Sequence, residues 1–106
     1  MKEINLGFED SCNVTRLAYN IKYKAGCLMM HRGIESFGKD YDSFLDVICE
    51  ASGKAFVFGI TERQRNYYFI KAKALFSRLP EEVKSCYIEA AKECSDMGKN
   101  LIEACI

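Results

Sequence analysis

The residues that could do chemistry are few and scattered in this chain of 106 amino acids. His31 is the single histidine, and general acid–base or nucleophilic catalysis needs such a base within hydrogen-bond reach of a partner. Two acidic pairs, Asp42 with Asp46 and Glu89 with Glu93, have the spacing of metal-binding carboxylates, but helical wheels turn them outward. We therefore predict no catalytic site, no metal site and no cofactor. An enzyme with an unrecognised site around His31 is kept as an alternative.

The cysteines are the second group of reactive side chains. No two of them have the C-x-x-C spacing of structural zinc sites, and only Cys27 lies as close as four residues to His31. The opening residues, MKEINLGFED, lack the pattern of a secretory signal, and no apolar run reaches the length of a membrane span. We therefore expect a cytoplasmic protein with no membrane association and with reduced thiols at Cys12, Cys27, Cys49, Cys86, Cys94 and Cys105.

Composition limits the class of protein further. The 15 Lys and Arg residues balance 15 Asp and Glu residues, and 49% of the chain is hydrophobic. This hydrophobic share excludes intrinsic disorder, and the length suits a single domain over residues 1–106. The zero net charge removes the bulk attraction that a general nucleic-acid or anionic-membrane binder would show.

Helical periodicity accounts for almost the whole chain. Apolar residues recur at alternating spacings of three and four over residues 10–36, 40–58 and 61–79, and again from Pro80 almost to the last residue. Thr61 and Gln64 have the spacing of a capping box at the start of the third segment. The sequence predicts an all-α protein, an antiparallel four-helix bundle with a short N-terminal arm.

The first predicted helix has two apolar rows on opposite sides. One row contains Val14, Ala18, Ile21 and Ala25 and is expected to face the core. The other lies roughly 160–180° away on a helical wheel. It is either internal, if this helix is central, or an exposed patch for self-association or for a partner protein. We predict the exposed patch, formed by Tyr19, Tyr23, Cys27, Met30 and Ile34.

The third predicted helix concentrates positive charge, with five Lys or Arg residues against one acid between residues 60 and 79. Arginines in its first turn oppose the helix dipole, which suggests that a negative group lies nearby. That group could be the acidic row Asp42, Asp46 and Glu50, the glutamates of the fourth helix, a protein partner or a nucleic acid. The candidate anion-binding or partner-binding residues are Arg63, Arg65, Tyr67, Lys71 and Arg78.

These patterns favour a protein that works by binding. We expect a small intracellular interaction protein, an adaptor, regulator or inhibitor of the kind that phages and mobile elements also encode. Its expected partner is a second copy of itself, as a homodimer, or another protein. A nucleic-acid-binding module that uses the basic third helix is the alternative, since a row of cations beside tyrosines could follow phosphates and stack on bases.

Overall fold

The computed structural model describes the backbone of residues 11–35 and 40–106, and their side chains except those of residues 11–13 and 55–58. The predicted N-terminal arm lies outside these residues. Within the described ranges every regular element is a helix, so the predicted all-α helical bundle is confirmed. None of these helices has the length and apolar character needed to cross a membrane. They are α1 (Ser11–His31), α2 (Ser43–Phe58), α3 (Glu62–Ser77), α4 (Glu81–Cys94) and α5 (Asp96–Cys105).

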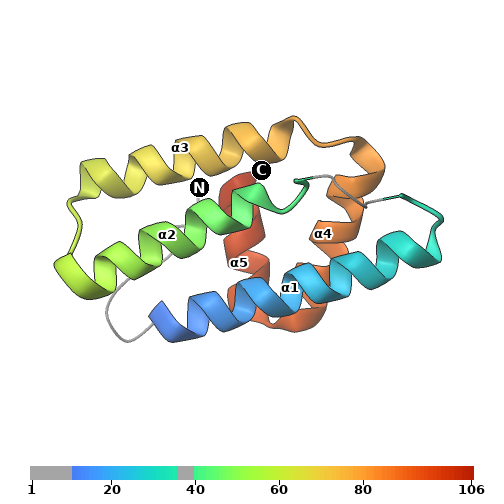
Figure 1. Ribbon diagram of the computed structural model, residues 1–106, viewed down its shortest axis with the longest axis horizontal. Coiled ribbons are helices and arrows are strands. Elements are labelled where there is room, and N and C mark those ends of the chain that lie inside the picture. The colour runs from blue at the N-terminus through green and yellow to red at the C-terminus, as the bar shows by residue number, and fades with distance from the viewer. Residues whose placement is uncertain (1–10, 36–39) are drawn as a thin grey trace.

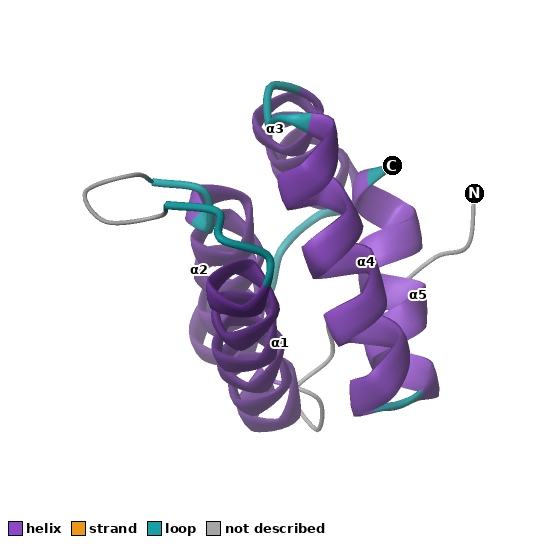
Figure 2. Cartoon of the chain, turned by 90° about the vertical axis from the view of Figure 1, so that its right-hand side faces the viewer, coloured by secondary structure: helices purple, strands orange, loops and turns teal. Residues whose placement is uncertain are grey.

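Four of the helices form two pairs, α1 with α2 and α4 with α5, and α3 packs against one helix of each pair. In Figure 1, α1, α2 and α3 follow one another in alternating directions, and α4 and α5 cross behind them. Figure 2 shows α1 beside α2 on one side of the molecule, α4 beside α5 on the other, and α3 along the upper edge of both pairs. Consequently α1 packs against α2 and α4, while α3 packs against α2 and α5.

Two helix ends illustrate how local sequence sets these boundaries. At the start of α3, the Thr61 hydroxyl accepts a hydrogen bond from the Gln64 backbone N–H, and the Gln64 side chain accepts one from the Thr61 N–H. The predicted capping box is therefore confirmed. α1 ends earlier than the predicted residue 36, because Gly33 takes a positive φ of 70° and the Ile34 N–H reaches back to the Met29 carbonyl.

The last predicted helix is in fact two helices, so the expected number of four is corrected to five within the described residues. Ser95 has extended backbone angles, and its hydroxyl accepts a hydrogen bond from the Gly98 N–H at the start of α5. α5 then turns back along α4 (Figure 2). The turn is tight: a Cβ atom at Gly98 would lie 2.6 Å from the Ala91 carbonyl oxygen.

The core is centred on three aromatic rings from three helices. Phe44 of α2 makes edge-to-face contacts with Phe76 of α3 and Tyr87 of α4, with ring centroids 4.9 and 5.1 Å apart. Phe44, Ile21 of α1 and Leu101 of α5 are fully buried, so all five helices contribute to one core. This rigid frame leaves the outer sides of α1 and α3 to face the solvent.

Candidate interaction surfaces

The second apolar row of α1 lies at the surface. The exposed fractions of Tyr19, Tyr23 and Met30 are 72%, 74% and 77%, and Cys27 between them is also exposed. Ile34 differs from the prediction, because it follows the end of α1 and packs partly against the core. We call the four exposed residues, Tyr19, Tyr23, Cys27 and Met30, the outer row of α1.

Ion pairs on both sides of this row hold the two lysines of α1. The Lys22 ammonium lies 2.7 Å from a carboxylate oxygen of Asp42, the residue just before α2. The hydrogen bond to Asp42 and the negative charge of Asp42 raise the pKa of Lys22. On the other side, Lys24 lies 3.8 Å from Glu93 of α4. Acids from the neighbouring segments therefore balance the lysines that flank the outer row.

Arg32 makes a third such contact just beyond α1. Its guanidinium forms an ion pair with Glu89 of α4 and donates a hydrogen bond to the Cys86 sulfur at 3.4 Å. These contacts raise the pKa of Arg32, the Glu89 hydrogen bond most strongly. Arg32 thus fastens the end of α1 to α4.

The outer side of α3 combines cations with exposed apolar groups. Arg63, Lys71 and Arg78 are exposed, as the helical wheel predicts, and Tyr67 has an exposed fraction of 60%. Ile70 on the same side is 69% exposed and was not among the predicted residues. An exposed isoleucine beside Tyr67, one helical turn away, is the signal that sequence reasoning overlooked.

Arg65, the remaining candidate binding residue, lies on the inner side of α3. It is half-buried, and its Nε atom is enclosed without a hydrogen-bond partner among the described residues. It therefore belongs to the inner edge of α3, apart from the exposed cations.

The acids that form ion pairs in the described part of the bundle pair with cations outside α3. Asp42 pairs with Lys22, Glu50 with Lys54 of its own helix, and three of the four glutamates of α4 with Lys24, Arg32 and Lys84. In the part of the chain that the structure describes, none of the Lys or Arg side chains from residue 63 to residue 78 makes an ion pair. The internal acidic partner considered from the sequence is therefore not found.

The groups considered for catalysis lie apart from one another. His31 is exposed at the end of α1, and no cluster of three or more His, Cys, Asp or Glu side chains in the described ranges could hold a metal ion. The five cysteines whose side chains are described are free, with Cys27 exposed and Cys105 buried. Burial raises the pKa of Cys105 to about 12, so its thiol stays protonated at neutral pH.

Comparisons with known proteins add no family to this description. No protein-family model, curated protein or solved structure matches the chain. The outer row of α1 and the basic side of α3 are therefore the features from which a function can be argued.

Proposed function

We propose that this protein acts by binding, and that it associates with a second copy of itself through the outer row of α1. The observation that carries the proposal is the exposure of Tyr19, Tyr23 and Met30, each above 70%, along one side of a single helix. Large exposed apolar groups that adjoin one another are uncommon in monomers and typical of interfaces. A dimer of this kind would serve as an adaptor, regulator or inhibitor.

The charges around the row favour an identical partner. α1 contains no Asp or Glu, and its lysines at positions 22 and 24 are paired with acids of the same subunit. A two-fold contact would therefore bring together two largely uncharged rows. In an antiparallel arrangement centred near residue 25, Tyr19 of one copy would face Met30 of the other, and Tyr23 would face Cys27.

Gly26 supports the same arrangement. It lies beside the proposed centre of the contact, and nothing stands within 4 Å of the position that a Cβ atom would take there. A small residue at a crossing point lets two helices approach closely. Its helix-weakening effect, close to 1 kcal/mol relative to alanine, is then offset by contact with the second copy.

The test is the mass of the assembly in solution, measured by light scattering after size-exclusion chromatography. Tyr23→Glu should reduce the mass from dimer to monomer, because it places two carboxylates in an apolar contact, and circular dichroism should show unchanged helicity. The matched control is Tyr67→Glu, which changes another exposed tyrosine, on α3, and should leave the dimer intact. A wild-type chain that is monomeric at high concentration would refute the proposal, as would a dimer that Tyr23→Glu leaves unchanged.

A second candidate function rests on the unpaired cations of α3. We propose that this side of the molecule takes an anionic partner, with nucleic acid as the case to test first, because Tyr67 stands beside Arg63 and Lys71. An aromatic ring among cations can stack on a base while the cations contact phosphates. Acidic protein segments present the same charge without bases.

Fluorescence anisotropy with labelled oligo-dT at several salt concentrations tests this candidate. The affinity should fall steeply as salt is added, and the double variant Arg63→Glu, Lys71→Glu should weaken binding by more than about tenfold. The variant Arg16→Glu, Lys99→Glu has the same change in net charge away from α3 and should weaken it far less. Absent or salt-insensitive binding would eliminate nucleic acid as the partner.

A further inference from the structure

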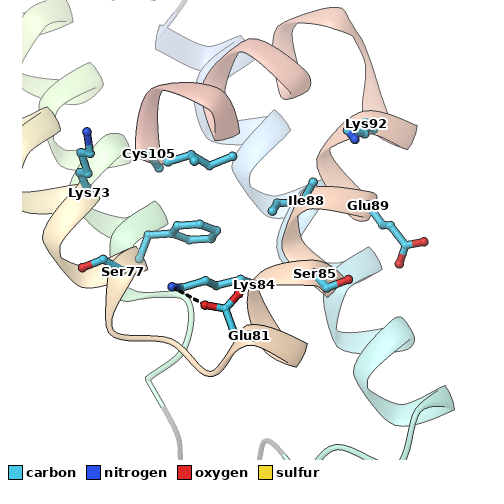
Figure 3. Close-up of a pocket in the computed structure, with 11 residues that line it drawn as sticks. Lys73, Ser77, Glu81, Lys84, Ser85, Ile88, Glu89, Lys92 and Cys105 are labelled. Carbon is cyan, nitrogen blue, oxygen red and sulfur yellow. Dashed lines mark hydrogen bonds and ion pairs between the residues drawn. The ribbon is translucent and has the colours of Figure 1, made fainter. Parts of the chain in front are cut away.

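A cavity of about 590 Å³ lies between the end of α3, the outer side of α4 and the end of α5 (Figure 3). This volume falls within the range of about 300–1,000 Å³ that is usual for small-molecule sites. The apolar part of its wall comes from Phe76, Ile88, Cys105 and Ile106. A cavity of this composition can enclose an apolar body of modest size.

The charged side chains around the cavity carry a small positive excess. Three lysines, Lys73, Lys84 and Lys92, line it together with two glutamates, Glu81 and Glu89. Glu89 is paired with Arg32, so it contributes little free negative charge here. Among the described residues Lys73 and Lys92 have no ion-pair partner.

Lys84 is the cation best placed to meet a ligand. Figure 3 shows its side chain reaching from α4 toward Ser77 of α3, with Glu81 on the outer side. Only 20% of the Lys84 side chain is exposed, whereas Glu81, whose carboxylate lies 3.3 Å from the ammonium, is 92% exposed. An exposed partner at that distance holds the ammonium weakly, so an anion inside the cavity could replace it.

We propose that this cavity binds a small amphiphilic anion, an apolar body that carries one carboxylate or sulfonate group. The apolar body would lie against Phe76 and Ile88, and the anionic group would meet the ammonium of Lys84. The ligand would be held without a covalent bond, because the Cys105 thiol in the wall is protonated and a thiol in that state is a poor nucleophile. This site is separate from the outer row of α1 and does not depend on dimer formation.

Decanoate is a suitable probe, titrated below its micelle concentration into the full chain and followed by two-dimensional amide NMR. We expect saturable shifts that cluster at residues around the cavity, including Ile88 and Cys105. Decyltrimethylammonium has the same chain and the opposite charge, and acetate has the charge without the chain, so both should bind at least about tenfold more weakly. Shifts that cluster on the outer row of α1 would overturn the proposal, as would equal binding of the cationic probe.

Two variants test the assigned residues. Lys84→Met keeps the apolar stem and removes the charge, and should weaken decanoate binding about five- to tenfold. Lys99→Met, an exposed lysine outside the cavity, is the matched control and should leave the affinity unchanged. Ile88→Trp should block the cavity and abolish binding, with its fold checked by circular dichroism. If it fails to fold, the Lys84→Met comparison decides alone: an affinity equal to that of the wild type would overturn the proposal.

Discussion

The outer sides of α1 and α3 both combine cations with exposed tyrosines, yet the two surfaces differ in how those cations are used. On α1 and the residue after it, Lys22, Lys24 and Arg32 each face an acid from another part of the bundle. On α3, Arg63 and Lys71 have no such acid among the described residues. One surface is thus apolar and largely neutralised, and the other retains its positive charge.

The difference follows from which helices are neighbours. α1 packs against α4, which carries four glutamates, and against α2, whereas α3 packs against α2 and α5, which carry two acids each. Since Asp42, Glu50 and three glutamates of α4 are paired with cations outside α3, the formal net charge of zero conceals a local excess of positive charge on α3. Overall charge is therefore a poor guide to the partner of any one surface in this protein.

The largest expected effect concerns the packing behind α1. In Gly98→Ala the new methyl group would press on the Ala91 carbonyl oxygen and approach Leu17 of α1 at 3.4 Å. We expect a loss of about 1–3 kcal/mol in the free energy of unfolding by urea. Hydrogen exchange should show the lost protection in α1, α4 and α5 before it appears in α2 and α3. An equal loss of protection in all helices would contradict this order, because it would show that the helices behind α1 and those behind α3 open together.

Gly26→Ala is the matched control for that substitution, since space is open around Gly26. In the background of Tyr23→Glu, where assembly does not contribute, it should raise the free energy of unfolding by up to about 1 kcal/mol, because alanine favours a helix. A loss of stability there would mean that α1 is more closely covered than the structure shows.

A smaller effect on the free energy of unfolding, of about 1.4 kcal/mol, is expected from the buried thiol of Cys105 in α5. Burial raises the pKa of Cys105 from its ordinary value of 9.0 to about 12. Above pH 9 the unfolded thiol ionises while the folded thiol does not, so stability that is fully present below pH 9 is lost as the pH rises toward 12. Between pH 7 and pH 10 this loss is about 1.4 kcal/mol for one such group.

The measurement is urea unfolding of the wild type and of Cys105→Ala at both pH values. Cys105→Ala should show the smaller alkaline loss, by about that amount. A thiol reagent should modify the exposed Cys27 of α1 rapidly in the native protein and Cys105 slowly. Identical alkaline losses in the two proteins would contradict the burial of Cys105.

The smallest effect tests the ion pairs directly. Lys22→Met should cost about 0.5 kcal/mol at low salt, because it breaks a partly exposed pair with Asp42, and added salt should reduce this cost. The pair raises the pKa of Lys22, so its contribution is present at neutral pH and is lost as the pH rises through that pKa. Lys71→Met on α3 removes no pair and should cost less; an equal cost would remove the distinction between the two surfaces.

The sequence allowed prediction of those features that depend on residues close together in the chain. Periodicity located the helical segments, the Thr61 capping box was confirmed, and the wheel of α1 separated the buried Ile21 from the exposed Tyr23. Ile34 was placed wrongly because a wheel assumes a continuing helix, and Gly33 ends it.

The break between α4 and α5 was missed although its signal was present. Ser95 followed by Asp96 has the composition of a helix start, but the apolar spacing continues across it, since Tyr87, Leu101 and Ala104 are all buried. The distribution of ion pairs and the cavity beside Phe76 could not be predicted, because both depend on which helices become neighbours in three dimensions.

The reversal of the chain at Ser95 also affects the order in which the molecule can be completed during synthesis. α5 contacts α3 and supplies Cys105 to the wall beside Phe76. That side of α3 therefore cannot be covered until residues 96–105 have left the ribosome, long after α3 itself has emerged. A nascent chain that holds only α1 to α4 must keep the apolar surface around Phe76 from other molecules until α5 arrives.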